Sequence, residues 1–181
     1  MNRLIDLLIA SVGLIAFLLL SCLLYPIGKA YFLKQRSYLF RQPRVGLNGS
    51  IFTIYKLQTL NELGVPISIY GKALRKLSLD EFPQFLNVLI GDMAIVGPRP
   101  MPVAEYEGFR GLIRDYDIRH KVKPGMTGLA QAFGYRGSVN LQTMRRRVKL
   151  DKLYIKNKTT ILDLKIIIAT ICSGLAYKNA K

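Results

Sequence analysis

The segment from Arg75 to Pro100 reads RKLSLDEFPQFLNVLIGDMAIVGPRP and is the most informative part of the sequence. Leucine and phenylalanine recur in it and just before it near helical spacing, which predicts a mainly helical stretch over residues 71–91. A turn at Gly91-Asp92 and a short buried stretch are expected to follow. The segment then ends in Gly97-Pro98-Arg99-Pro100, which we expect to be a rigid loop because each proline fixes its own φ angle.

Two adjacent carboxylates, Asp80 and Glu81, allow a structural and a functional interpretation. In the structural one, Ser78-x-x-Glu81 is a capping box, and Asp80 merely favours the positive end of the helix dipole. In the functional one, Pro83 removes a main-chain hydrogen bond, bends the first turn and leaves Asp80 exposed at a distorted helix start. On local physics alone, the capping box is the better explanation of Glu81.

Two arginines near this pair favour phosphate chemistry. Arg75 precedes Asp80 by about one turn, and the first amides of a helix lack partners and attract anions. Arg99 has its backbone pre-set by Pro98 and Pro100, and its guanidinium fork matches phosphate oxygens. The set therefore suits a carboxylate that acts on a diphosphate held by rigid arginines.

The composition points to an anionic membrane surface. Lys and Arg number 27 against 11 Asp and Glu, a formal net charge of +16, yet hydrophobic residues make up 50% of the chain. A soluble nucleic-acid binder is seldom both this basic and this apolar, and the sequence has no recognisable basic–aromatic motif, so no nucleic-acid partner is expected. Anionic lipids attract Lys and Arg at about 1 kcal/mol each, which favours a membrane as the partner.

The cysteines and the histidine disfavour several kinds of site. Cys22 and Cys172 lie in apolar runs without a Cys or His at metal-ligand spacing, so we expect buried small side chains rather than a disulfide or a zinc site. His120 is the single histidine, and it cannot build a metal cluster or a Ser–His or Cys–His pair. Phosphoryl transfer needs positioning and charge neutralisation more than acid–base groups, and it suits such a chain.

An uncharged run from Leu7 to Tyr25 predicts a membrane helix within residues 1–38. As a helix it would be about 28 Å long, close to the hydrocarbon thickness. A cleaved signal peptide is disfavoured, because the basic region before the run is thin, Asp6 intrudes and no A-x-A site follows. Two arrangements stay open: a transmembrane span, or a re-entrant helix that breaks at Pro26. If the run is a transmembrane span, the basic residues after it predict that nearly all the rest of the chain lies in the cytoplasm.

Residues 39–181 are predicted to form one helix-rich α/β domain. A turn signal at residues 46–49, followed by alternating and β-branched residues, indicates a small β-hairpin within residues 39–59. The strongly basic residues 145–158 suit an amphipathic helix that lies against anionic headgroups. The uncharged run at residues 166–176 is too short to span a bilayer, and it predicts either a core helix or an interfacial one.

The segment quoted first resembles the signature of the bacterial sugar transferases, the monotopic phosphoglycosyl transferases that start glycan assembly on a polyprenol phosphate. Three further stretches are similar to this family, in the same order along the chain. They are FRQPRVGLNGSIFTIYK (residues 40–56), RHKVKPGMTGLAQ (residues 119–131) and LDKLYIKNKTTILDLKIIIATI (residues 150–171). The resemblance covers nearly the whole chain, so it is more specific than any single motif.

The resemblance implies a role for each matching residue. Asp80 would attack the β-phosphorus of a UDP-sugar, release UMP and carry the phosphosugar as a covalent intermediate until a polyprenol phosphate, such as undecaprenyl phosphate, takes it. Glu81 would support Asp80 or handle protons. Mg²⁺ would neutralise the diphosphate, with Asp80 as its protein ligand. The implied substrate-binding residues are Lys56, Arg75, Pro98, Arg99 and Arg136.

The same resemblance implies a place for the protein and leaves several points open. It implies the cytoplasmic face of a bacterial inner membrane, and the first membrane step of exopolysaccharide, capsule, O-antigen or glycoprotein synthesis. Gln58 and Tyr135 stand where the family usually has arginine, so a catalytically silent scaffold that binds nucleotide-sugar or lipid is the alternative. The sugar, the glycan and the number of associated copies, including a homodimer, stay open.

Overall fold

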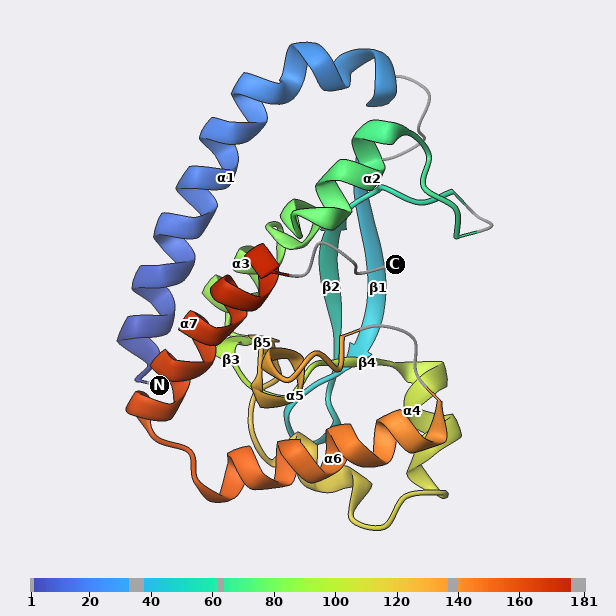
Figure 1. The fold of residues 1–181 in the computed structure, drawn as a ribbon, viewed down its shortest axis with the longest axis vertical. Coiled ribbons are helices and arrows are strands. Elements are labelled where there is room, and N and C mark those ends of the chain that lie inside the picture. Colours follow the sequence, from blue (N-terminus) through green and yellow to red (C-terminus); the bar gives the residue numbers. More distant parts are fainter. Residues whose placement is uncertain (1, 33–37, 62–63, 137–139, 177–181) are drawn as a thin grey trace.

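The computed structural model describes residues 2–32, 38–61, 64–136 and 140–176. It confirms a helix-rich α/β fold with two small sheets and a long apolar N-terminal helix (Figure 1). The helices are α1 (Arg3–Phe32), α2 (Ile69–Lys76), α3 (Gln84–Ile90), α4 (Val103–Arg110), α5 (Leu129–Ala132), α6 (Leu141–Lys156) and α7 (Thr160–Ala176). The strands are β1 (Leu39–Val45), β2 (Ile51–Leu57), β3 (Ala94–Val96), β4 (Met101–Pro102) and β5 (Gly125–Thr127). Short 3-10 turns are η1 (Leu47–Gly49), η2 (Leu79–Glu81) and η3 (Tyr116–Lys121).

The predicted β-hairpin is confirmed. Strands β1 and β2 pair antiparallel from Leu39 opposite Leu57 to Val45 opposite Ile51, and β4 joins the outer edge of β1. The connection uses Asn48 at φ 53°, in the left-handed region that asparagine tolerates better than most residues. The hairpin places the end of β2, which carries a lysine of the candidate site, against η2.

A parallel pair, β3 and β5, brings two rigid turns together. Gly97 follows β3 and Gly125 begins β5, and their backbones touch: a Cβ on Gly125 would lie 2.0 Å from the amide nitrogen of Gly97. Only glycine fits at such a distance. The Gly97–Pro100 loop is therefore fixed against the turn that precedes β5.

The helix predicted over residues 71–91 is wrong in its middle. The chain leaves α2 after Lys76, passes through Ser78 in the left-handed region (φ 56°), forms η2 and enters α3 at Gln84. Ser78 makes no capping hydrogen bond from its side chain, so the capping box is also wrong. Pro83 stands at the start of α3 with a helical φ of −58°, where its missing N–H costs nothing.

Asn87 attaches α3 to the free edge of β2. Its side-chain nitrogen donates to the carbonyl oxygen of Thr53 at 2.7 Å, and its side-chain oxygen accepts from the amide of Tyr55 at 3.1 Å. The amide thus replaces a neighbouring strand at this edge. Asn87 is fully buried, so these contacts fix how α3, and with it η2, lies against the hairpin.

Replacing Asn87 with alanine is expected to destabilise the protein. The loss of both hydrogen bonds, with buried groups left unpaired, should cost about 1–3 kcal/mol, and each kcal/mol lowers the melting temperature of a chain this size by about 2–4 °C. Thermal unfolding in detergent measures this. Asn157→Ala is the matched control, because its side chain bonds only within its own exposed turn; an equal shift in both variants would contradict the account.

Helix α1 is bound closely to the rest of the protein. Arg3 donates to the carbonyl oxygens of Val88 and Leu89 at the end of α3, and buried Asp6 accepts from the amide of Ile95 in β3. Farther along, Gly13 lets the two helices approach, since a Cβ there would lie 2.5 Å from the ring of Phe85. Helix α1 therefore reaches the segment that follows η2.

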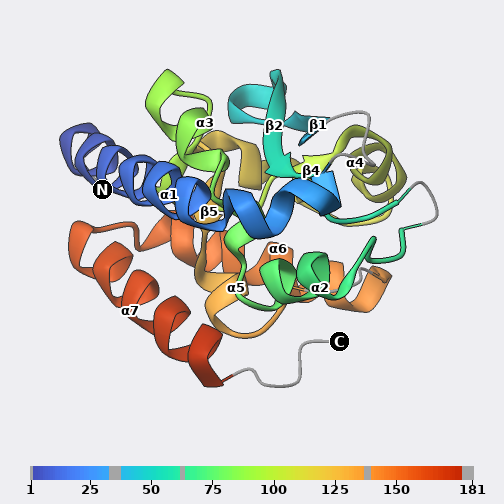
Figure 2. The same ribbon diagram turned by 90° about the horizontal axis from the view of Figure 1, so that it is seen from above.

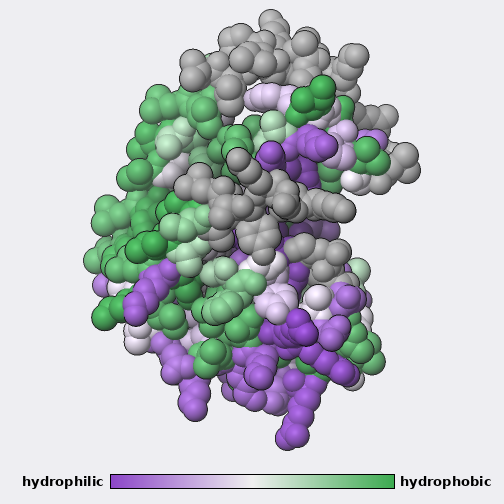
Figure 3. Space-filling view, in the orientation of Figure 1, coloured by the Kyte–Doolittle hydropathy of each residue, from purple (hydrophilic) through white to green (hydrophobic). Residues whose placement is uncertain are grey.

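The outer side of α1 forms an apolar face with α7 and α3 (Figures 1 and 3). Figure 3 shows this apolar surface over α1 and α7, and α3 adds exposed apolar side chains beside α1. The exposed side chains are Leu4, Leu8, Val12, Ile15, Leu18 and Leu19 on α1, Leu86 and Ile90 on α3, and Ile161, Leu164, Ile168 and Ile171 on α7. Residues Arg3–Cys22 are long and apolar enough to cross a membrane. The helix does not break at Pro26: it continues to Phe32 and bends over at that end (Figures 1 and 2).

The sequence predicted either a core helix or an interfacial helix at residues 166–176, and α7 has one buried side and one exposed side. Its inner side holds buried Ile166 and Asp163, and the Asp163 carboxylate lies 2.8 Å from the hydroxyl of Tyr154 on α6. Its outer side is apolar and exposed. Cys22 and Cys172 are also exposed, which corrects the expectation that they are buried. Both lie on helices whose outer surface is apolar, so an apolar neighbourhood in the sequence did not mean burial.

Candidate active site

Five charged side chains from separate elements meet where η2 faces the hairpin. Lys56 comes from β2, Arg75 from the last turn of α2, and Asp80 and Glu81 from η2. Arg99 comes from the loop between β3 and β4. Ion pairs join Glu81 to Lys56 and Arg99, and a separate one joins Asp80 to Arg75. Because Asp80 and Glu81 are adjacent in η2, the structure brings together most of the residues predicted to act on substrate.

Glu81 is held by two cations. Its Oε1 lies 2.6 Å from the Lys56 ammonium and 2.9 Å from Nη2 of Arg99, whose Nη1 lies 3.5 Å from Oε2. Burial alone would raise the pKa of the Glu81 carboxyl, but the charges of Arg99 and Lys56 outweigh it and hold that pKa far below its ordinary value. Glu81 therefore stays ionised and cannot donate a proton near neutral pH.

Asp80 is in a different environment. Only 5% of the residue is exposed, which corrects the expectation of an exposed carboxylate, and it forms a long ion pair with Arg75 at 3.9 Å. Burial raises the pKa of the Asp80 carboxyl above its ordinary value, and the negative charge of Glu81 raises it further. A weakly hydrated carboxylate with a raised pKa is a stronger nucleophile than an exposed one. The two neighbours thus have pKa values pushed apart, an arrangement typical of functional pairs.

Pro98 contributes to the site through its backbone. It is buried, and its carbonyl oxygen accepts from the amide of Gly125 at 2.9 Å, while Gly97 donates to Thr127 at 2.8 Å. These bonds fix the loop that carries Arg99. A direct contact of Pro98 with the substrate stays a prediction.

Arg136 lies in the turn after α5, where its Nε donates to the carbonyl oxygen of Gln131 at 3.2 Å. Gln58, which stands where the family usually has an arginine, donates from its side chain to the carbonyl oxygen of Leu60. A role for Arg136 in binding substrate stays a prediction.

Two arginines at this site were not singled out from the sequence. Arg44 on β1 and Arg119 in η3 both donate to carbonyl oxygens of the Arg99-Pro100 loop. Both lie in stretches that resemble the family, but their partners are far away in the chain, and nothing local indicates such contacts.

Protein atoms at this site could supply only some of the ligands of a magnesium ion. Among the described residues, no cluster of three or more His, Cys, Asp or Glu side chains could hold a metal. Glu81 is already paired with Lys56 and Arg99, which leaves Asp80 as the available carboxylate. Protein sites for Mg²⁺ commonly use one or two carboxylates together with substrate phosphates, so Asp80 fits that donor set.

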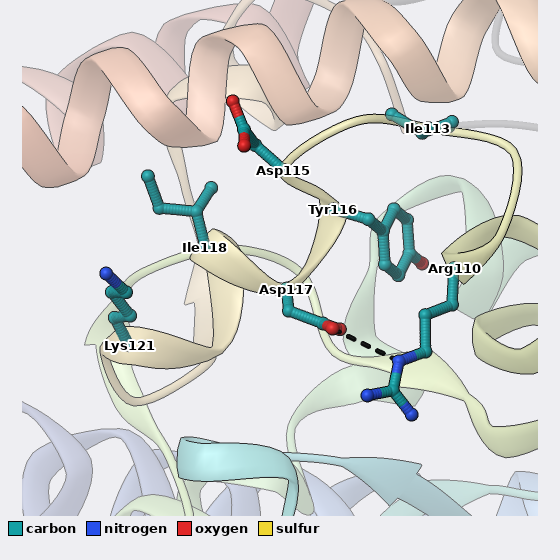
Figure 4. A pocket seen from close by; sticks show the side chains of 7 residues that line it. All are labelled: Arg110, Ile113, Asp115, Tyr116, Asp117, Ile118 and Lys121. Atoms are coloured by element: carbon teal, nitrogen blue, oxygen red, sulfur yellow. Dashed lines mark hydrogen bonds and ion pairs between the residues drawn. The ribbon is translucent and has the colours of Figure 1, made fainter.

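A cavity of about 340 Å³ lies away from this group, beside η3 (Figure 4). It is lined by Arg110, Ile113, Asp115, Tyr116, Asp117, Ile118 and Lys121. Arg110 and Asp117 pair with each other at 3.1 Å across it. The cavity contains none of the residues predicted to act on substrate.

Comparison with known proteins gives a family. The model of the bacterial sugar transferase family matches residues 1–176. The chain is 40% identical, over 99% of its length, to a UDP-glucose:undecaprenyl-phosphate glucose-1-phosphate transferase of Klebsiella pneumoniae, and 42% identical, over 78%, to a protein of the same name from Escherichia coli K12. It is 35% identical, over 79%, to a UDP-N-acetylgalactosamine-undecaprenyl-phosphate N-acetylgalactosaminephosphotransferase of Aeromonas hydrophila. The matches span 41%, 33% and 36% of those three proteins.

Proposed function

Because the chain belongs to the bacterial sugar transferase family, we propose that it transfers a sugar phosphate from a UDP-sugar to undecaprenyl phosphate and releases UMP. The observation that carries this proposal is the contrast within η2. Glu81 is neutralised by Lys56 and Arg99, whereas neighbouring Asp80 is buried with a raised pKa. That contrast suits a nucleophile beside a site for a diphosphate.

The reaction proceeds in two displacements. An oxygen of the Asp80 carboxylate attacks the β-phosphorus of the donor, the bond from that phosphorus to the bridging oxygen breaks, and UMP leaves with that oxygen. A phosphate oxygen of undecaprenyl phosphate then attacks the same phosphorus and releases the carboxylate. The product is a lipid diphosphate that carries the sugar, and Asp80 is regenerated.

Lys56 and Arg99 bind the diphosphate in this scheme. Their positive ends converge on one anionic group, the Glu81 carboxylate, so both cations lie beside the same part of the site. Glu81 keeps the two cations in place before the donor arrives, which lowers the cost of organising them. Arg75 is half exposed and lies 3.9 Å from Asp80, so its charge would attract the anionic substrate toward the nucleophile.

Magnesium is part of the proposal through Asp80 alone. When bound, the ion would neutralise charge on the diphosphate oxygens. The protein would supply the Asp80 carboxylate as its ligand, and substrate oxygens and water would complete the shell. Glu81 stays with its two cations.

The apolar face of α1, α3 and α7 is the surface that we place in the membrane. It suits the cytoplasmic face of a bacterial inner membrane, where the lipid acceptor is embedded and anionic lipids attract the basic chain. The continuous helix α1 is packed against α3, so the membrane segment and the candidate site form one body. We further propose that the product enters bacterial glycan synthesis.

The Glu81→Gln variant tests the electrostatics of the pair. Asp80 must be ionised to attack, so kcat/KM should fall on the acid side with a midpoint above the ordinary pKa of aspartate. Glutamine removes a charge that raises the pKa of Asp80 and frees Lys56 to lower it. The acid limb should therefore move to lower pH, while the plateau falls by about 10²-fold because the two cations are less well held.

A pH profile of UMP release measures both effects. Asp117→Asn is the control, because Asp117 is exposed and pairs with Arg110 away from the site. Its profile should match that of the unmodified protein. An acid limb that stays in place or moves upward in Glu81→Gln would show that Glu81 does not set the pKa of Asp80.

A panel of UDP-sugars tests the function itself. Purified protein in lipid nanodiscs is given Mg²⁺, undecaprenyl phosphate and one donor at a time, beginning with UDP-glucose and UDP-N-acetylgalactosamine. UMP release that depends on both substrates is the expected result. Donor binding without UMP release for every sugar would instead identify a catalytically silent scaffold.

A further inference from the structure

The loop that carries Arg99 is held by side chains from distant elements. Pro98 and Pro100 have no N–H, so the loop offers carbonyl oxygens with few donors of its own. Nη2 of Arg119 donates to the carbonyl oxygen of Arg99 at 3.0 Å, and Nη1 of Arg44 donates to that of Pro100 at 2.8 Å. Two consecutive carbonyls are thus fixed by guanidinium groups.

Arg119 is itself fixed on several sides. Its side chain is 1% exposed and forms an ion pair with Asp151 of α6, at 3.0 Å. Its Nη1 also donates to the hydroxyl of Tyr116 at 3.3 Å. These contacts hold the Arg119 side chain between several partners. Through Arg119, η3 and α6 are connected to the loop.

Arg44 provides the second support. It lies on β1 opposite Pro102 of β4, and its Nη2 donates to the side-chain oxygen of Gln42 at 2.6 Å. Burial, followed by the nearby charge of Arg99, lowers the pKa of Arg44 to about 10, which still leaves it charged at neutral pH. Strand β1 therefore holds the loop at Pro100, just before the chain enters β4.

We propose that Arg119, with Arg44, is a positioning residue that sets where the Arg99 guanidinium meets the donor diphosphate. The inference rests on the proposed function, in which Arg99 binds that group. The Arg99 backbone is set by its proline neighbours and by both arginines, and its guanidinium reaches Glu81 at 2.9 Å. A displaced loop would move the guanidinium, and a misplacement of about 1 Å can cost about 10²-fold in rate.

A double-mutant cycle with Arg99 tests this. Arg119→Met with Asp151→Leu removes both charges of the buried pair and leaves the net charge unchanged. Buried Arg147 on α6 loses the attraction of Asp151 in this variant, so thermal unfolding is measured first to establish that the protein is folded. We expect kcat/KM for UMP release to fall by about 10²-fold when Arg99 is present. In an Arg99→Ala background the same change should alter kcat/KM by less than about twofold, because the effect acts through Arg99.

The control and a second variant make the result decisive. Lys152→Met with Asp115→Asn breaks another α6 ion pair, at 2.8 Å, that is exposed and has no contact with the loop; it should leave kcat/KM unchanged. If the buried-pair variant does not fold, Arg44→Met enters the same cycle, since Arg44 donates to the Pro100 carbonyl and the Gln42 side-chain oxygen, which are both uncharged. Equal losses with and without Arg99, or no loss at all, overturn the inference. An unmodified protein that releases no UMP overturns the proposed function, and the inference with it.

Discussion

An Asp80→Ala variant is expected to release no measurable UMP from any UDP-sugar. In the proposed reaction this carboxylate forms the bond to phosphorus, and removal of a nucleophile typically costs at least about 10³-fold in kcat. Glu81 cannot replace it, because that carboxylate is held by Lys56 and Arg99. Asp80→Asn, which keeps the shape of the side chain, should be equally inactive.

The control for this prediction is Asp117→Asn, which removes an exposed carboxylate away from the site. Its rate of UMP release should equal that of the unmodified protein. Both Asp80 variants should still bind the UDP-sugar, as measured by equilibrium titration, because the diphosphate is held by the cations. UMP release by either Asp80 variant within about tenfold of the unmodified rate would exclude Asp80 as the nucleophile.

An Arg99→Ala variant is expected to have the second largest effect. The guanidinium supplies a fork for the diphosphate in a site from which water is largely excluded, so its loss should lower kcat/KM by about 10²–10³-fold. Arg99→Lys should recover only part of this, because an ammonium lacks the fork geometry.

Initial rates over a range of UDP-sugar concentrations, with saturating acceptor, measure the Arg99 effect. Arg110→Ala is the matched control, because this exposed arginine forms an ion pair with Asp117, away from the site. Full activity in Arg99→Lys would mean that charge alone matters. Full activity in Arg99→Ala would remove Arg99 from the site.

Much of the fold could be predicted from local sequence. The turn residues around Asn48 gave the hairpin, and the uncharged N-terminal run gave α1. The capping box failed because its residues satisfied a local pattern while distant groups decided the outcome. Glu81 turns to Lys56 on β2, and Ser78 takes a left-handed conformation that lets the chain leave α2 before α3.

The charged residues of the candidate site could be predicted, but the residues that hold them in place could not. The resemblance to the family identified Asp80, Glu81, Lys56, Arg75 and Arg99, and the structure pairs Glu81 with Lys56 and Arg99, and Asp80 with Arg75. The burial of Asp80 and the contacts of Asn87, Arg44 and Arg119 depend on residues far away in the chain. Such contacts carry no local period or spacing, so a single sequence does not reveal them.

The central claim is that Asp80 carries the phosphosugar between two displacements, and isotope exchange tests it most directly. The protein is incubated with Mg²⁺, an unlabelled UDP-sugar that it accepts and labelled UMP, without any polyprenol phosphate. A covalent intermediate predicts that label appears in the UDP-sugar, because the first displacement reverses without the acceptor. No label should appear with Asp80→Asn. A protein that completes the full reaction but shows no exchange without the acceptor would contradict the account.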